Sequence, residues 1–193
     1  MYDAMADPYC YDGTTVLKNI PGIRDQASLD KFEMVMTAQR SDEPLPRGRL
    51  SVSHYCAIHH HLFQDIYAWA GRFRTVRIGK DGSAFCYPEH INREMRAAFA
   101  ALARRRYREK ADRKVFAAEA ASFITTLNAI HPFREGNGRT QTTFLAILAD
   151  RAGHPLDLNK LEPERFLSAM VASFKGDERP LIRQILLLTN ADG

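Results

Sequence analysis

Residues 128–140 read NAIHPFREGNGRT, a polar stretch with two glycines between two segments of helical character. Pro132 disfavours helical geometry in the residue before it, so we expect the preceding helix to end there. Gly136 and Gly138 permit positive φ and close backbone approach, and the next helix is expected to begin around Arg139. The stretch therefore predicts a tight loop between two helices.

This loop has the composition of an anion-binding site. Glycines let the backbone approach an anion where the next helix presents unpaired N–H groups and its positive dipole end. Glu135 suits Mg²⁺, Arg139 can bind a phosphate through two hydrogen bonds, and Asn137 can donate to a phosphoryl oxygen. His131 can accept a proton from an attacking hydroxyl. Each residue alone also fits an ordinary interhelical turn, but the set within nine positions favours phosphate chemistry.

Outside this loop, apolar residues recur mostly at helical spacing. Ser51 is expected to cap a helix with a wide apolar stripe that ends at Gly71. The first 24 residues show no period and predict an irregular arm, and 25–193 predicts one all-α domain. Helices are predicted over residues 26–40, 51–71, 88–107, 112–130, 139–151, 163–174 and 180–189.

Residues 73–87 change to a β pattern. Two β-favouring pieces, 75–78 and 84–87, flank Asp81-Gly82, which is a hairpin signal. An isolated hairpin is marginally stable, so it is expected either to pack on the helices as a structural flap or to pair with a strand from a partner.

Charge and cysteine usage exclude several classes. The chain has 27 basic and 23 acidic residues and a net charge of +4. The basic run over 104–114 contains a single aromatic residue, Tyr107, and no nucleic-acid fold motif accompanies it. We therefore interpret the run as a solvated helix face and expect no nucleic-acid partner. Cys10, Cys56 and Cys86 form no C-x-x-C pair, which predicts reduced thiols rather than disulfides or zinc ligands.

Two other features carry no predicted chemistry. Consecutive helical residues point about 100° apart, so the run 59–61 with His54 is not expected to bind a metal; we expect His59 in the core and the other histidines at the surface. No apolar run reaches the ~20 residues of a spanning helix, and the start lacks a signal-peptide pattern. We expect a cytoplasmic protein without a membrane segment.

The stretch 131–139, HPFREGNGR, closely resembles the signature of the Fic (filamentation induced by cAMP) family, HxFx(D/E)GNGRxxR. Residues 57–71 are similar to the upstream core helix of the family, and the predicted hairpin lies where the family has a target-binding flap. The resemblance covers residues 25 to 188. It implies a Fic-like helical core with a small β-hairpin flap and transfer of AMP from Mg-ATP to a Tyr, Thr or Ser hydroxyl of a target protein.

The resemblance also assigns roles. Phe133 would anchor the loop in the core, and the target would bind through the flap, where Ile78 and Phe85 are expected to frame the modified residue. The remaining assignments are His131 as the base, Glu135 as the Mg²⁺ ligand, and Gly136, Asn137, Gly138, Arg139 and Thr142 at the phosphates of ATP.

The chain departs from the signature at Thr142, where the family usually has a second arginine that contacts the terminal phosphate. A threonine offers one neutral hydrogen bond and no charged fork. The departure leaves two alternatives to AMP transfer: transfer of another phosphate-containing group, or a catalytically degenerate domain that only binds a protein.

Many relatives are inhibited by a helix with the pattern (S/T)xxxE(G/N), which this chain lacks. We therefore expect a separate small antitoxin that carries the pattern if the chain is the toxin of a toxin–antitoxin pair. The other expectation is an effector domain that is delivered into a host cytoplasm.

Overall fold

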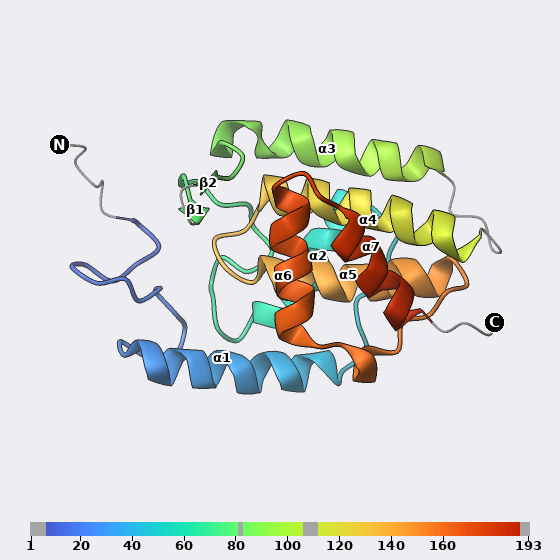
Figure 1. Ribbon diagram of the computed structural model, residues 1–193. Helices are drawn as coiled ribbons and strands as arrows, with labels where there is room; N and C mark the ends of the chain where they lie inside the picture. Colours follow the sequence, from blue (N-terminus) through green and yellow to red (C-terminus); the bar gives the residue numbers. More distant parts are fainter. Residues whose placement is uncertain (1–6, 81–82, 106–111, 190–193) are drawn as a thin grey trace.

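The computed structural model describes residues 7–80, 83–105 and 112–189, and these residues form a mainly helical fold (Figure 1). The predicted all-α class is confirmed. None of the helices in these ranges is long and apolar enough to cross a membrane. The elements are α1 (Gln26–Ser41), α2 (Val52–Phe63), β1 (Gly79–Lys80), β2 (Ser83–Ala84), α3 (Pro88–Arg105), α4 (Arg113–Ile130), α5 (Asn137–Arg151), a 3₁₀ turn (Leu158–Lys160), α6 (Pro163–Phe174) and α7 (Arg179–Leu188).

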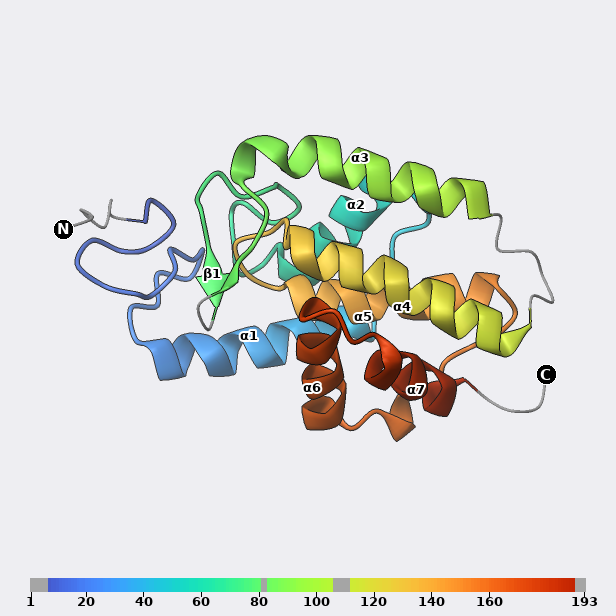
Figure 2. The same ribbon diagram turned by 45° about the horizontal axis from the view of Figure 1, so that its top comes forward.

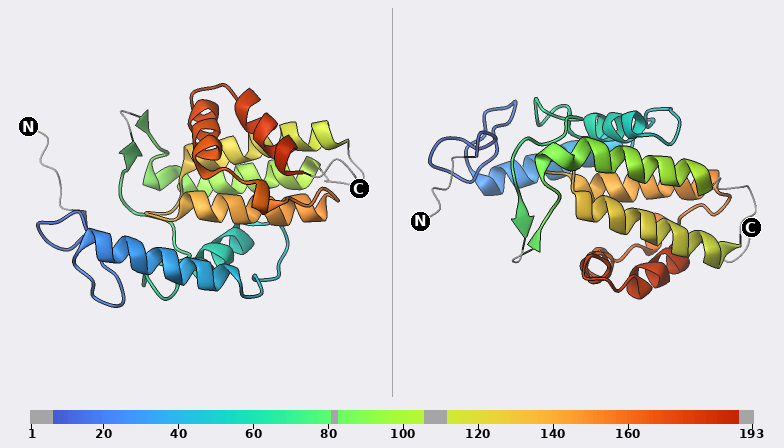
Figure 3. Two further views of the ribbon diagram at one scale, coloured as in Figure 1. Left: turned by 60° about the horizontal axis from the view of Figure 1, so that its bottom comes forward. Right: turned by 90° about the horizontal axis from the view of Figure 1, so that it is seen from above.

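Helices α4 and α5 occupy the centre of the fold, and the segment that joins them carries the signature. Helix α4 packs against α3, α5, α6 and α7, while α5 also packs against α2. Helix α1 packs on α2, and Figure 2 shows it extending beyond the other helices toward the N-terminal arm. The view from above in Figure 3 places α2 on one side of the central pair and α6 with α7 on the other.

Aromatic rings from four helices hold the central elements together. The ring of Phe144 on α5 lies 5.4 Å from Tyr55 on α2, 5.5 Å from Phe99 on α3 and 5.9 Å from Phe123 on α4. All four side chains are buried. Burial of each such ring stabilises the fold by about 1.5–3 kcal/mol, so this cluster holds α4 and α5, the two helices on either side of the signature segment, against α2 and α3.

Two predicted helix boundaries are wrong. Helix α2, which Ser51 caps as expected, ends at Phe63 instead of Gly71. After Phe63 the backbone makes turns in which Ile66 bonds to Phe63 and Ala70 to Tyr67, and these turns still bury the apolar stripe. At the other boundary, α5 begins at Asn137, two residues before the predicted start.

The hairpin has less regular pairing than predicted. Only Gly79↔Ala84 and Lys80↔Ser83 pair, so the strands expected over 75–78 and 84–87 are wrong in extent. One further bond crosses the hairpin, from the Phe85 N–H to the Ile78 carbonyl at 3.3 Å. Other backbone groups bond outside the hairpin: the Arg74 side chain donates to the carbonyls of Val76 and Cys86, and the Cys86 N–H donates to the Ala129 carbonyl. The predicted turn at 81–82 and most of the basic run, 106–111, lie outside the described residues.

Candidate active site

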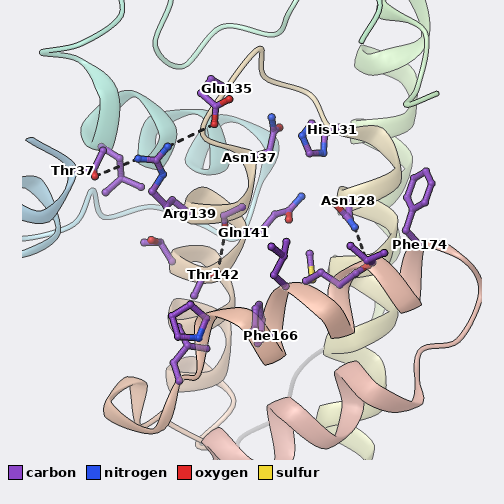
Figure 4. Close-up of a pocket in the computed structure, with 18 of the residues that line it drawn as sticks. Thr37, Asn128, His131, Glu135, Asn137, Arg139, Gln141, Thr142, Phe166 and Phe174 are labelled. Atoms are coloured by element: carbon purple, nitrogen blue, oxygen red, sulfur yellow. Dashed lines mark hydrogen bonds and ion pairs between the residues drawn. The ribbon is translucent and has the colours of Figure 1, made fainter. Parts of the chain in front are cut away.

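A cavity of about 730 Å³ lies between α1, α5, α6 and the segment that joins α4 to α5 (Figure 4). We call residues 131–139 the motif segment. Phe85 lines the cavity, whereas Gly136 and Ile78, which the structure also describes, do not. The other predicted site residues on its wall are His131, Glu135, Asn137, Gly138, Arg139 and Thr142.

Gly136 creates the N-terminus of α5 at the edge of this cavity. Its φ is +80°, and an added Cβ would lie 2.4 Å from Cζ of Phe63, so no other residue fits without displacing that ring. The first N–H in the helical ladder is that of Thr140, which bonds to the Gly136 carbonyl. The N–H groups of residues 137–139 precede this bond and have no partner within the helix, which is the geometry of an anion site.

The side-chain amide of Asn137, which was expected to donate to a phosphate, bonds to the backbone of Phe133. Its Oδ1 accepts from the Phe133 N–H at 2.9 Å, and its Nδ2 donates to the Phe133 carbonyl at 2.8 Å. The amide therefore closes the motif segment on itself and is almost fully buried. A contact from Asn137 to a phosphate would come chiefly from its backbone N–H rather than from the side chain.

His59 on α2 supports the same segment from the core. The Gly71 N–H donates to its Nδ1 at 2.8 Å, so the ring proton sits on Nε2 and is donated to the Glu135 carbonyl at 3.0 Å. The ring stacks on Phe133 with 3.7 Å between centroids. Burial lowers the pKa of His59 to about 3, and the ring is neutral at pH 7.

His131 ends α4 in the left-handed conformation, with φ +48°. This strained backbone is held by Arg74, whose Nε donates to the His131 carbonyl at 2.8 Å. The imidazole stacks on Phe85 with 3.9 Å between centroids. Backbone and ring are thus both fixed by residues that flank the hairpin.

Arg74 is a buried cation that donates to four backbone carbonyls. Besides His131, it donates to Val76, Cys86 and Ile130. Burial lowers its pKa, but four carbonyls and the negative end of α4 compensate for the buried charge. Arg74 therefore ties both sides of the hairpin to the C-terminus of α4.

Arg139 is held by α1. Its guanidinium forms an ion pair with Glu33, lies 3.4 Å from the Thr37 hydroxyl, and covers the Phe63 ring at 4.8 Å. Its distance to the nearest oxygen of Glu135 is 3.6 Å. The predicted contact of Arg139 with a phosphate would use the guanidinium N–H groups that do not bond to Glu33 or Thr37.

The side chains of two further residues of the signature region form hydrogen bonds or ion pairs with other residues of the chain. The Thr142 hydroxyl donates to the Gly138 carbonyl at 3.1 Å, so its only donor is used inside α5. Arg134 forms an ion pair with Asp7 at 2.8 Å and lies 3.9 Å from the Cys10 sulfur. The motif segment is therefore also joined to the N-terminal arm.

The four histidines near α2 bond to separate backbone carbonyls. His54 contacts Pro46, His60 contacts Ala70 and His61 contacts Arg40. His59 is in the core as predicted, but the surface position expected for His54 is wrong, since this ring packs against Phe144 and is 4% exposed.

Sequence reasoning missed three parts of the site. Arg74 lies in an irregular piece between elements, and Glu33 lies far from the signature in the chain, so neither had a local signal. The third part is an apolar wall of the cavity on α6. The spacing of apolar residues predicted this helix but not that it would lie against the site. The main residues of the wall are Phe166, Met170, Val171 and Phe174.

Fold and site together define a helical protein that presents a glycine-bearing helix N-terminus and a histidine to one cavity. Residues 49–149 match the model of the Fic/DOC family, and the chain belongs to this family. It is 52% identical over 185 residues to the probable protein adenylyltransferase y4lH of Sinorhizobium fredii, which covers 95% of this chain and 96% of that protein. Protein adenylyltransferase VbhT of Bartonella schoenbuchensis is 37% identical over 180 residues, or 91% of this chain and 37% of VbhT.

Solved structures agree with this membership. The BepC effector of Bartonella tribocorum, solved with AMPPNP, has a TM-score of 0.83 at 25% identity and covers 96% of this chain and 97% of its own. The N-terminal Fic domain of a Bep effector of Bartonella quintana, solved with ADP, has a TM-score of 0.81 at 30% identity and covers 94% of each chain. The predicted family and enzyme class, a nucleotidyltransferase, are confirmed.

Proposed function

We propose that this chain transfers AMP from Mg-ATP to a hydroxyl side chain, Tyr, Thr or Ser, of a target protein. The observation that carries the proposal is the convergence of His131 and the N-terminus of α5 on one cavity. A transfer of this kind needs an anion site and a proton acceptor side by side. The relatives that are named adenylyltransferases, and the AMPPNP bound to BepC, support the choice of nucleotide.

The proposed reaction is a displacement at the α-phosphorus of ATP. The target hydroxyl oxygen forms a bond to this phosphorus, and the bond from the phosphorus to the bridging oxygen of the β-phosphate breaks. Pyrophosphate leaves with the electron pair of that bond. The hydroxyl proton goes to the imidazole of His131, and Phe85 keeps this ring in place by stacking.

The phosphates bind the N-terminus of α5. The backbone N–H groups of residues 137–139 receive the α- and β-phosphates, and Gly138 leaves room because no atom lies within 4 Å of an added Cβ there. Gly136 contributes the backbone turn, and Arg139 adds positive charge. The terminal phosphate lacks a charged partner at Thr142, so ATP binds more weakly than it would with arginine at this position.

The donor set near the phosphates fits a magnesium ion. Mg²⁺ is commonly held by one or two carboxylates together with substrate phosphates and waters. Glu135 would supply one such carboxylate; its Oε1 accepts the Gly136 N–H at 2.8 Å, which holds the carboxylate at the start of α5. When bound, the ion neutralises phosphate charge.

Partners and cellular role follow from the same proposal. The target binds through the hairpin, with Ile78 and Phe85 beside the modified residue. A separate small antitoxin with the (S/T)xxxE(G/N) pattern inhibits the enzyme if it acts as a toxin. As an effector domain it acts in a host cytoplasm, and the Bep relatives, whose names describe VirB-translocated effectors, support this second setting.

The test is a labelling experiment in a cell lysate with Mg-ATP, followed by mass spectrometry of the modified proteins. The wild-type chain should add AMP to one or a few targets. His131→Ala should leave the fold and nucleotide binding intact but slow transfer by roughly 10²–10⁴-fold. Equal labelling by both chains would contradict the role of His131.

A second candidate is a degenerate domain that binds a protein without turnover. The neutral Thr142, whose hydroxyl is used inside α5, is the observation that favours it. Failure of the wild type to label any target, with intact binding of a partner, would support this alternative.

A further inference from the structure

Gln141 directs a buried amide into the cavity. The residue is 1% exposed and lines the cavity wall, and its Nε2 has no hydrogen-bond partner among the described residues. In Figure 4 the amide points toward Asn128, on the side where His131 lies. Since an unpartnered buried donor destabilises the folded chain, its presence in a cavity wall indicates that a ligand supplies the missing acceptor.

The position of Gln141 on α5 restricts which part of a ligand it can reach. It follows Asn137 by four residues and Gly138 by three, so it lies on the same face of the helix as the phosphate-binding N-terminus. One helical turn, about 5.4 Å, separates it from those N–H groups. At this distance from the phosphate-binding N–H groups, Gln141 would reach the nucleoside that is attached to the α-phosphate rather than the phosphates themselves.

Uncharged side chains of α4 and α6 form most of the cavity wall away from Arg139. Asn128 donates its Nδ2 to the Met170 carbonyl at 3.2 Å, which fixes this second amide on the cavity wall. Phe166, Met170 and Phe174 provide the apolar surface next to it. Arg139 points to the opposite side, toward Thr37, as Figure 4 shows. The cavity thus has Arg139 at the end proposed for phosphates and a mainly apolar, partly aromatic wall on α6, with Lys175 where that helix ends.

The geometry points to Gln141 as a specificity-determining residue whose Nε2 donates a hydrogen bond to the nucleoside half, sugar or base, of the donor nucleotide. The inference rests on the proposed function, because it takes the ligand to be a nucleotide whose phosphates bind the N-terminus of α5. It adds a neutral contact that selects a nucleotide over a bare polyphosphate.

The test uses calorimetric titration of the full chain with ATP and, separately, with inorganic triphosphate. Gln141→Leu and Gln141→Met remove the donor while keeping a side chain of similar size. Both should bind ATP about five- to tenfold more weakly and triphosphate as tightly as the wild type. Their melting temperatures should be unchanged or higher, because the unpartnered amide is gone. Gln39→Leu, the same change at an exposed position of α1 outside the cavity, should alter neither affinity.

Three outcomes would overturn the inference. Unchanged ATP affinity in both variants would remove Gln141 from the site and leave the proposed function intact. Equal weakening of ATP and triphosphate, with a lower melting temperature, would show a structural role for Gln141 instead. Failure of the wild type to bind ATP at all would overturn the proposed function, and this inference with it.

Discussion

The motif segment and the hairpin segment, residues 75–87, meet at His131 but are built in opposite ways. The motif segment is held by buried partners on several sides: His59 from α2, Arg74 from the loop after it, and the amide of Asn137 from within. The hairpin segment has only two paired residues in each strand. The motif segment, which is proposed to bind the phosphates of the nucleotide, is thus preorganised. The hairpin segment, which is proposed to bind the target protein, makes few regular backbone hydrogen bonds.

This contrast corresponds to the demands of each task. Electrostatic stabilisation of phosphates requires donors that are already in place, because reorganising them would cost free energy at the moment of reaction. Pairing with an extended target segment needs open backbone groups instead. Changes in the motif segment should therefore have large effects on stability and nucleotide binding, and changes in the hairpin segment should have small ones.

The largest effect is expected for Gly136→Ala. The added Cβ would lie 2.4 Å from Cζ of Phe63, and the φ of +80° is unfavourable for alanine. Overpacking and backbone strain together should lower the free energy of unfolding by about 2–5 kcal/mol. Chemical denaturation of wild type and variant measures this difference.

Gly138→Ala is the matched control, two residues along the same segment. No atom lies within 4 Å of its added Cβ, and the residue is helical, so the free energy of unfolding should be unchanged or rise by up to about 1 kcal/mol. Because Gly138 lines the cavity, the methyl group should still weaken ATP binding. Equal destabilisation by both substitutions would contradict the preorganised segment.

Thr142→Arg tests the departure from the family signature. A charge-assisted contact to the terminal phosphate is worth about 1.5–3 kcal/mol, so ATP should bind roughly ten- to a hundredfold more tightly, and ADP should gain much less. Calorimetry with both nucleotides separates this contact from a general gain of positive charge. If ATP gains nothing, the terminal phosphate lies elsewhere or the donor is not ATP.

The support from His59 should appear in the pH dependence of stability. The unfolded chain protonates this ring below about pH 6.5, whereas the folded chain does so only near its pKa of about 3. Stability should therefore fall as the pH drops through this window, by about 2 kcal/mol from this group at pH 5. Thermal unfolding from pH 7 to 4 measures the slope. His59→Gln should flatten it, and His60→Gln, at the exposed neighbouring position, should not.

The smallest effect is expected in the hairpin segment. Ile78→Ala should change the free energy of unfolding by at most about 1 kcal/mol and leave ATP affinity unchanged, while target labelling drops several-fold. Phe85→Ala should slow labelling further, because its ring stacks on His131. Labelling rates at saturating ATP compare the two variants. Equal loss of ATP affinity in Ile78→Ala would place this residue at the nucleotide instead of the target.

How far the sequence predicts this protein depends on whether the signal is local. Among the described residues, helical spacing predicted each α-helix but not the 3₁₀ turn Leu158–Lys160, and the glycines with Pro132 predicted the loop, because these signals act through neighbouring residues. The end of α2 at Phe63 was not predictable, since turns bury its apolar stripe as well as a helix would. Arg74 and Glu33 reach the site only through tertiary packing, and the self-bonded amide of Asn137 needs the folded loop.

Transfer of label from ATP tests the central claim most directly. Lysate proteins are incubated with the chain and either α-labelled or γ-labelled ATP, with His131→Ala as the control. AMP transfer predicts that target proteins retain the α label and not the γ label, and that the control retains almost none of either. Retention of the γ label, dependent on His131, would show that the terminal phosphate is the group transferred and would contradict the account.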